Sequence, residues 1–345
     1  MKKNTNALTS APISRRALIG ALGAGALAVT SLPNILRAQA AKQETPETMT
    51  DNHQGAGFYQ FRIGIYHLTL ISDGGGQAEP SFLFPKVPTD ELNTALHDQF
   101  MNQGKVPLQI NALLIRGNGR TILVDTGVGP DGLPNLGLVA RHLKRLDLDE
   151  TQIDTVFITH MHGDHIGGLL NAEGGIAYPN AKVLINEREY DFWNGNPDLS
   201  QTGIPEVARK NTIAKAQNVS KVYEGRWEFL NDDAEIAPGI KLIFAPGHTP
   251  GHSGLEISSR EEKMIYIADT VHVVQLQAPH PNWHIAFDTF PVQAAKTRNA
   301  ILKRAADERL YTSGSHLPFP ANGHFRAVGD AYQWQPIIWR WVVPS

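Results

Sequence analysis

The segment Thr159–Gly168, which reads THMHGDHIGG, contains three imidazoles and one carboxylate within six positions and directly follows an apolar run, 156–158. Neutral imidazoles and a carboxylate crowded together need a cation or many hydrogen bonds to satisfy them. In an extended loop alternate residues point the same way, so His160 and His162 can converge on one ion while Asp164 and His165 turn towards a second. We therefore expect half of a metal site here, completed by residues from elsewhere in the chain.

Three further candidate ligands stand where predicted strands end. His248 follows the run 240–244 and lies in a tight loop rich in glycine and proline, 246–252. Asp269 follows a run without charged residues, 264–268, and His316 follows the run 309–315. The chain has no cysteine, so any metal must be held by nitrogen and oxygen atoms.

The pattern of apolar residues predicts strands and helices in both halves of the chain. The expected strands are 61–71, 111–116, 121–124, 155–158, 182–185, 227–230, 240–244, 263–268 and 309–311. The expected helices are 90–101, 138–146, 187–192 and 291–306, with another starting at 166, a turn at 72–76 and a loop at 80–88. Because no linker separates the halves, we expect a single α/β domain over 58–345 with two similar halves.

Residues 1–40 differ in kind from the rest. A basic, polar start leads to the pair Arg15-Arg16, an Ala/Gly/Leu-rich run to Thr30, and Ala38-Gln39-Ala40. This layout is typical of an export signal with a small-residue cleavage site and resembles the twin-arginine type, which carries folded proteins. We expect a periplasmic or secreted protein whose residues 41–57 form a flexible leader. The alternatives are a disordered tail or a membrane anchor, although the apolar run is too short to span a bilayer.

The net charge of the chain limits which ligands it can bind. The formal charge of −3 becomes −8 without residues 1–40, which hold five basic side chains and no acidic one. An acidic protein lacks the Lys and Arg that neutralise phosphates, so we expect no nucleic-acid ligand. We also expect no membrane association once the signal is removed.

Five features together resemble the successive motifs of the metallo-β-lactamase superfamily, in the family's order. They are Asp125–Gly127, Thr159–His165, Gly247–His252, Asp269 and His316. The resemblance covers nearly all of the chain after residue 57 and implies a four-layer αβ/βα sandwich with a two-metal site at the edge of the sheets.

The resemblance also implies two Zn²⁺ ions per chain, although other divalent metals suit the same ligands. Family members with iron chemistry tend to have a glutamate within the histidine loop, and His162 at that position favours zinc. Two ions about 3.5 to 4 Å apart can share a water of lowered pKa, so a metal-bound hydroxide is the expected nucleophile. Asp164 and Asp269 are the expected catalytic carboxylates. The implied ligands are His160, His162 and His248 for the first ion and Asp164, His165 and His316 for the second, with Asp269 bridging.

Two more residues are expected to support these ligands. Asp125 is too far back along the chain to be a ligand itself, and we expect it to orient the histidine loop from behind. His252 lies four residues after His248 and is expected to act as a hydrogen-bonding support. His272, His280, His284 and His324 are expected to be ordinary surface or pocket histidines.

A closer resemblance concerns the substrate. The segments 71–74, 191–193, 315–327 and 332–336 are similar to the methyl-parathion-hydrolase group, relatives of the acyl-homoserine-lactone lactonases, in which aromatic residues wall the cleft above the metals. Trp193 would be one wall by motif position, and the alternative for each candidate is core packing. The weaker candidates for the substrate pocket are Phe82, Phe84, Leu133 and Trp283.

These features favour a hydrolase acting on a small, neutral, apolar ester, with an organophosphate triester as the first expectation and an N-acyl-homoserine lactone or other lactone as the alternative. A bridging aspartate disfavours a true β-lactamase, and the absence of basic patches disfavours a nuclease. A non-catalytic metal-binding scaffold is the alternative from another class, but scaffolds of this fold usually lose ligands. A homodimer is possible through the aromatic residues Trp334, Trp339 and Trp341.

Overall fold

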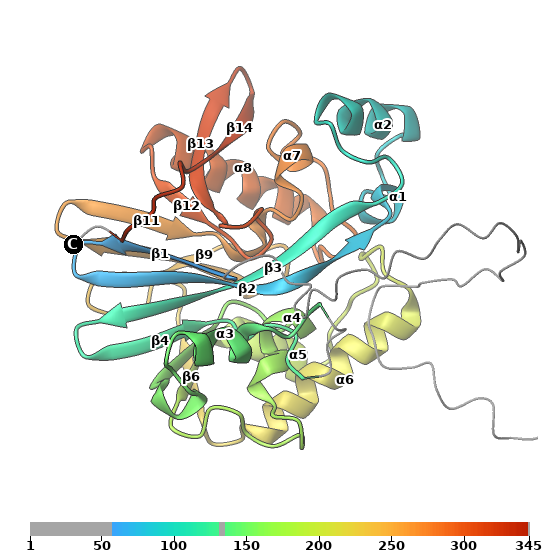
Figure 1. The fold of residues 1–345 in the computed structure, drawn as a ribbon. Coiled ribbons are helices and arrows are strands. Elements are labelled where there is room, and N and C mark those ends of the chain that lie inside the picture. The colour runs from blue at the N-terminus through green and yellow to red at the C-terminus, as the bar shows by residue number, and fades with distance from the viewer. Residues whose placement is uncertain (1–56, 131–134, 344–345) are drawn as a thin grey trace, which may run out of the picture.

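Two sheets of seven strands each lie face to face, with helices on their outer faces (Figure 1). The computed structural model describes residues 57–130 and 135–343. The expected export signal, nearly all of the expected leader, and the pocket candidate Leu133 lie outside the described residues. The predicted four-layer sandwich is confirmed, whereas a single domain over 58–345 stays a prediction.

The first sheet has the order β1 to β7 and changes from antiparallel to parallel at β4. In β5, Phe157 faces the core between the sheets while Val156 and Ile158 face the helices, so both faces of the strand are covered. Strands buried on both faces are typical of parallel pairing, and their sequences are continuously apolar. The strands are β1 (Phe58–Ile63), β2 (Tyr66–Ala78), β3 (Val106–Gly117), β4 (Arg120–Val124), β5 (Thr155–Ile158), β6 (Lys182–Asn186) and β7 (Trp227–Leu230).

The second sheet has the order β14 to β8, and among its neighbours β11 and β12 pair in parallel. Its inner face shares one apolar core with the first sheet, so burial of both inner faces holds the halves together. The strands are β8 (Glu235–Ala237), β9 (Ile240–Phe244), β10 (Ser253–Ser259), β11 (Glu262–Tyr266), β12 (Tyr311–Ser313), β13 (Asn322–Val328) and β14 (Ala331–Pro336).

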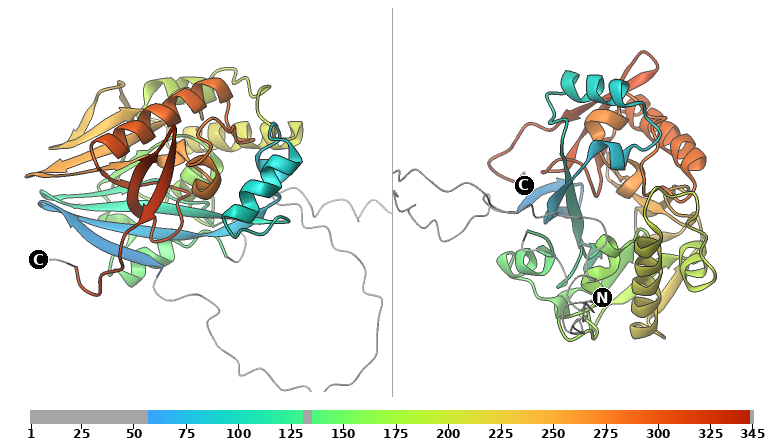
Figure 2. Two further views of the ribbon diagram at one scale, coloured as in Figure 1. Left: turned by 90° about the horizontal axis from the view of Figure 1, so that it is seen from above. Right: turned by 90° about the vertical axis from the view of Figure 1, so that its right-hand side faces the viewer.

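Helices cover both outer faces, as the two further views in Figure 2 show. Helices α3, α5 and α6 pack on the first sheet, and α8 packs on the second. Within the described ranges no helix is long and apolar enough to cross a bilayer. The helices are α1 (Pro80–Leu83), α2 (Thr89–Asp98), α3 (Val139–Arg145), α4 (Gly163–Ile166), α5 (Glu187–Asn194), α6 (Glu206–Val222), α7 (Val274–Gln277) and α8 (Pro291–Asp307), with 3-10 turns η1 (Glu150–Gln152), η2 (Gly167–Leu169) and η3 (Ala268–Thr270).

The N-terminal part of the first sheet corrects three expectations. The single strand expected over 61–71 is a hairpin, because Gly64 adopts a positive φ of 54° and turns the chain between β1 and β2. The expected turn at 72–76 lies inside β2, where a shift in pairing between Ser72 and Gly74 absorbs the glycines as a bulge. The expected loop at 80–88 begins with the short helix α1.

Further corrections concern the helices and the second sheet. The helix expected to start at residue 166 ends there, because the histidine loop itself forms α4. The strand expected last, over 309–311, corresponds to β12, which begins at Tyr311, and two more strands, β13 and β14, follow it. The sequence analysis also missed α6 and β10, although most of the strands around the metal-ligand candidates were predicted.

Candidate metal centre

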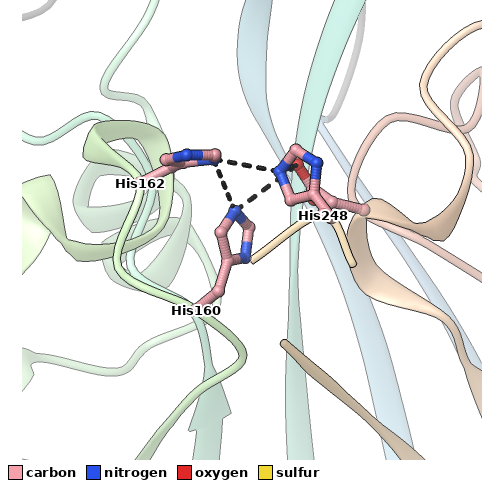
Figure 3. A group of neighbouring side chains, drawn as sticks. His160, His162 and His248 are labelled. Carbon is pink, nitrogen blue, oxygen red and sulfur yellow. Dashed lines mark hydrogen bonds and ion pairs between the residues drawn. The ribbon is translucent and has the colours of Figure 1, made fainter. Parts of the chain in front are cut away.

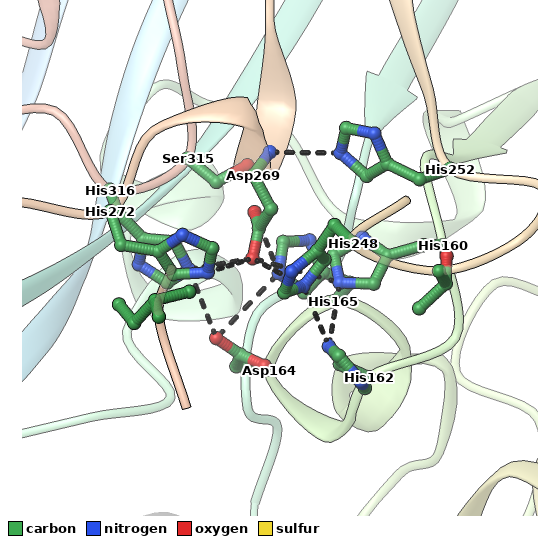
Figure 4. Close-up of polar contacts among 12 residues, drawn as sticks. His160, His162, Asp164, His165, His248, His252, Asp269, His272, Ser315 and His316 are labelled. Carbon is green, nitrogen blue, oxygen red and sulfur yellow. Dashed lines mark hydrogen bonds and ion pairs between the residues drawn. The ribbon is translucent and has the colours of Figure 1, made fainter. Parts of the chain in front are cut away.

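The predicted ligands meet at one edge of the two sheets (Figure 4). Each comes from a segment that follows a strand: the histidine loop follows β5, the loop of His248 follows β9, Asp269 follows β11, and His316 follows β12. Three overlapping groups of side chains could hold a metal ion. They are His160, His162, His248 and Asp269; Asp164, His165 and His316; and Asp269, His272 and His316.

The first group is built around three imidazoles (Figure 3). His162 Nδ1 lies 3.0 Å from His160 Nε2 and 2.9 Å from His248 Nε2. Asp269 Oδ2 lies 3.6 Å from His160 Nε2 and 3.4 Å from His248 Nε2. At most one proton can lie between each pair of nitrogens, so lone pairs remain that face the middle of the group and can bind a cation.

The second group lies against Asp269 of the first. His165 Nε2 lies 3.3 Å from Asp269 Oδ1, and His316 Nε2 lies 2.9 Å from Asp269 Oδ2. Asp164 Oδ2 is 3.6 Å from both of these ring nitrogens. The side chain of Asp164 is 29% exposed, whereas that of Asp269 is 2% exposed, so the centre opens towards solvent on the side of Asp164.

Hydrogen bonds behind the rings fix which nitrogen faces the centre. The Nδ1 atom of His165 lies 2.8 Å from Asp125, that of His248 lies 3.0 Å from Asp288, and that of His316 lies 2.6 Å from the carbonyl oxygen of Gln109. An Nδ1–H that donates to these oxygens leaves Nε2 with a lone pair towards the centre, as in metal-binding histidines.

The electrostatics of the centre attract positive charge. Burial lowers the pKa of His160 and His162 well below the usual histidine value, which keeps both rings neutral. Burial opposes ionisation of Asp269, but His165 and His316 hold the pKa of its carboxyl well below its usual range. Burial alone would lower the pKa of His248, yet Asp269 and Asp288 raise it to about 9. A metal ion can supply the same positive charge in place of protons.

The donor set fits a metal such as zinc. Within the described part of the chain, the buried atoms His165 Nε2 and Asp269 Oδ1 lie 3.3 Å apart, yet neither makes a hydrogen bond of good geometry. Leaving such atoms unpaired in the interior is costly, and a shared cation would satisfy both. Imidazole nitrogens and carboxylate oxygens are ligands that zinc prefers.

Comparison with known proteins identifies the family. The family model described as the metallo-beta-lactamase superfamily matches residues 106–316, which is more than half of the chain. The chain belongs to the metallo-beta-lactamase superfamily. The matched residues include every candidate ligand from His160 to His316, so the superfamily resemblance predicted from the motifs is confirmed.

Members of the superfamily that are similar to this chain include lactonases. The solved structure of AidC, a dizinc quorum-quenching lactonase in complex with the product N-hexanoyl-L-homoserine, is 30% identical, with a TM-score of 0.78 over 82% of this chain and 98% of that chain. The hydrolase AbOPH is 29% identical, with a TM-score of 0.76 over 84% of this chain and 100% of that one. An N-acyl homoserine lactonase of Bacillus thuringiensis is 26% identical over 165 residues, 42% of this chain and 57% of that protein. The chain thus spans just over half the length of such curated relatives.

Asp125 contacts the histidine loop from behind, as expected. Its Oδ1 accepts the backbone N–H of Thr159 at 2.9 Å, and its Oδ2 lies 2.8 Å from His165 Nδ1. Asp125 has a positive φ of 60°, a conformation that few residues other than glycine adopt and that aspartate tolerates. In this superfamily member, the turn after β4 thus holds both ends of the short segment from Thr159 to His165.

We expect Asp125→Asn to lower zinc affinity at the second group by about 10- to 100-fold while the protein stays folded. The amide must turn its NH₂ group towards either the Thr159 N–H or the His165 ring, so one of the two contacts is lost. Competition with a chelator, measured beside circular dichroism, checks this result. Unchanged zinc affinity in the folded variant would contradict it.

His252 supports Asp269 and has no free nitrogen to offer a metal. Its Nδ1–H donates to the carbonyl oxygen of Ala245 at 2.8 Å, and its Nε2 accepts the backbone N–H of Asp269 at 3.0 Å. Burial lowers the pKa of His252 to about 3, so the ring stays neutral and holds this arrangement. His252 therefore lies where the sequence analysis expected it, as a hydrogen-bonding support and not as a ligand.

The sequence analysis missed two residues at the centre. His272, expected to be an ordinary histidine, is buried, with Nε2 3.1 Å from Asp269 Oδ2 and its ring stacked on that of His316. Its position three residues after Asp269 was the available signal. Asp288 contacts His248 and also lies 3.3 Å from Nη2 of the buried Arg298. No local pattern marks Asp288, because its contacts come from distant segments.

The aromatic pocket candidates require correction. Trp193 and Phe84 are 0% exposed and pack in the core, so neither lines an open cleft. The ring of Trp193 lies edge-on to that of His162, with 5.5 Å between the ring centroids, and supports it from the core. Phe82 and Trp283 are partly exposed. The ring of Phe82 lies edge-on to that of Phe287, with 5.9 Å between the ring centroids.

Proposed function

We propose that this protein is a dinuclear zinc hydrolase that opens the lactone ring of N-acyl homoserine lactones. The observation that carries the proposal is the set of eight side chains that could hold metal ions, the seven expected ligands and His272, on a fold shared with a dizinc lactonase over 98% of that chain. The sequence analysis placed an organophosphate triester first. The relatives favour its lactone alternative, and the burial of Trp193 and Phe84 weakens the argument for a flat aromatic cleft.

The residues of the centre suit ring opening. A bound zinc pair supplies a water of lowered pKa and positive charge for the carbonyl oxygen. The buried imidazoles and Asp269 hold this charge at a fixed place and need no rearrangement during the reaction. Asp164 is the most exposed carboxylate among the candidate ligands. Burial opposes its ionisation, but His165 and His316 hold the pKa of its carboxyl below the usual range. Asp164 would therefore accept a proton from the attacking water and return it to the ring oxygen, which leaves as an alcohol when the ester C–O bond breaks.

A paired assay tests the substrate class. The zinc-loaded enzyme is assayed on N-hexanoyl and N-decanoyl homoserine lactones, with proton release as the signal, and on methyl parathion. We expect kcat/KM for a lactone to exceed that for the triester by at least about tenfold, a difference of about 1.4 kcal/mol in transition-state binding. The reverse preference would restore the triester as substrate, and no turnover of either class would contradict both.

Two further expectations from the sequence stand as proposals. Export of the folded protein to the periplasm or beyond rests on residues 1–40, and sequencing the N-terminus of the protein recovered from that compartment tests it. Dimerisation rests on the aromatic C-terminal residues: Trp339 and Trp341 are 49% and 91% exposed, whereas Trp334 packs against the core. Exposed aromatic residues of this kind suit an interface.

A further inference from the structure

The first metal group is assembled from two different sheets. His160 and His162 follow β5 of the first sheet, while His248 lies between β9 and β10 of the second. The close approach of His162 to His248, 2.9 Å between ring nitrogens, therefore depends on how the two loops are held against each other. Direct backbone contact between the loops includes the bond from Ser253 N–H to the carbonyl oxygen of Thr159, at 3.0 Å.

A buried carboxylate joins the same two loops. Glu189, in the first turn of α5, is 0% exposed and accepts the backbone N–H of Met161, the residue between His160 and His162, at 2.9 Å through Oε1. Its Oε2 accepts the backbone N–H of Gly251 at 2.9 Å and the hydroxyl of Thr249, the residue next to His248, at 2.6 Å. One side chain thus contacts the immediate neighbours of all three imidazoles.

We propose that Glu189 is the positioning residue of the first metal group and that its ionised carboxylate sets the distance between the His160–His162 loop and the His248 loop. The inference rests on the proposed metal site but does not depend on the identity of the substrate.

Burial raises the pKa of the Glu189 carboxyl, but the hydrogen bonds that it accepts favour the ionised form. All four groups that Glu189 contacts act as donors: the N–H groups of Met161 and Gly251, the hydroxyl of Thr249 and the indole N–H of Trp193 at 2.7 Å. Hydrogen bonds to an ionised acceptor are about twice as strong as neutral ones, which helps offset the cost of burying the charge. A glutamine has one acceptor oxygen, so its NH₂ group must face a backbone N–H in either orientation.

The packing around Gly251 provides a second observation. A Cβ atom at Gly251 would lie 2.2 Å from the backbone nitrogen of Glu189 and 2.5 Å from its Cβ. The His248 loop can therefore approach the first turn of α5 only because residue 251 is glycine. Gly251→Ala perturbs the same junction from the opposite side, without changing the carboxylate.

The experiment compares Glu189→Gln and Gly251→Ala with a matched control, Glu187→Gln. The control makes the same chemical change at an exposed glutamate in the same first turn of α5. For each purified zinc enzyme, zinc affinity is measured by competition with a chelator, the visible spectrum is recorded after exchange to Co²⁺, and thermal unfolding of the metal-free protein is followed.

We expect Glu189→Gln and Gly251→Ala to lower the affinity for one of two zinc ions by about 10- to 100-fold and to change the Co²⁺ spectrum, while Glu187→Gln keeps the wild-type spectrum. A Glu189→Gln protein that unfolds at lower temperature but keeps the wild-type zinc affinity and Co²⁺ spectrum would overturn the inference, because Glu189 would then only stabilise the fold. If Glu189→Gln does not fold, Gly251→Ala decides by the same two readouts. Wild-type protein that binds no zinc would instead contradict the proposed metal site itself.

Discussion

Asp269→Ala is expected to abolish hydrolysis, with kcat/KM falling by more than about 10³-fold, because loss of a single preorganised charge-stabilising group already costs about 10²- to 10³-fold. Asp269 is 2% exposed, and its carboxylate lies within 3.6 Å of ring nitrogens of five histidines. Removing it takes away the negative charge that both metal groups share. We therefore expect zinc content to fall together with activity.

The control for this variant is Asp154→Ala. Asp154 lies just before β5, at the end opposite to the histidine loop, and pairs with Arg120 at 2.8 Å on the partly exposed surface. Its loss should cost about 1 kcal/mol of stability and no zinc. Measuring zinc content, activity and circular dichroism in parallel separates the two effects. An Asp269→Ala enzyme that keeps two zinc ions and more than a tenth of wild-type activity would refute the bridging role.

Metal removal is the second change with a large expected effect. Dialysis against a chelator should remove all measurable lactone hydrolysis, and added Zn²⁺ should restore it. The metal-free protein should also unfold at a lower temperature, because a ligand at 1,000 times its dissociation constant stabilises the folded state by about 4 kcal/mol. The structure gives the reason. Without a cation, the ring nitrogens of His160, His162 and His248 face one another at close range, and Asp269 Oδ1 and His165 Nε2 make no hydrogen bond among the described residues.

Activity assays and thermal unfolding on the same metal-free sample check this prediction. A matched sample taken through dialysis without chelator controls for losses in handling. Full activity in protein shown by elemental analysis to hold no metal would exclude metal-dependent hydrolysis.

The candidate ligands could be found from the sequence because each sits in a local pattern. The four candidates of the histidine loop fall within six residues, and His248, Asp269 and His316 each follow an apolar strand. Strand ends of a layered α/β protein meet at one edge, so local patterns were enough to bring distant residues together. The apolar strands, such as β5, predicted a single α/β domain with two similar halves, whereas the four-layer sandwich was implied by the family resemblance.

The residues that support the ligands could not be predicted in this way. Glu189 and Asp288 lie on segments without a metal-ligand pattern, and their contacts join loops 28 to 62 residues away in sequence. Such contacts follow from the packing of α5 and the loop before α8, which no single stretch encodes. Asp125 was the exception, because it belongs to a motif of the family.

The substrate ranking was the weakest inference, and the structure explains why. An aromatic residue can line a cleft or pack in the core, and composition does not tell which of these two roles it has. Trp193 and Phe84 serve the core, with Trp193 donating its indole N–H to Glu189. The expectation of a triester rested on the resemblance of four segments to the methyl-parathion-hydrolase group, with such residues as cleft walls. The metal-ligand candidates suit both substrates, and the relatives favour the lactone.

The most direct test of the central claim is an anomalous difference map at the zinc absorption edge, from crystals of the protein purified with zinc. Our account predicts two peaks per chain, one among His160, His162 and His248 and one among Asp164, His165 and His316, with Asp269 between them. A single peak, or none, at these positions in a chain that hydrolyses lactones would contradict it.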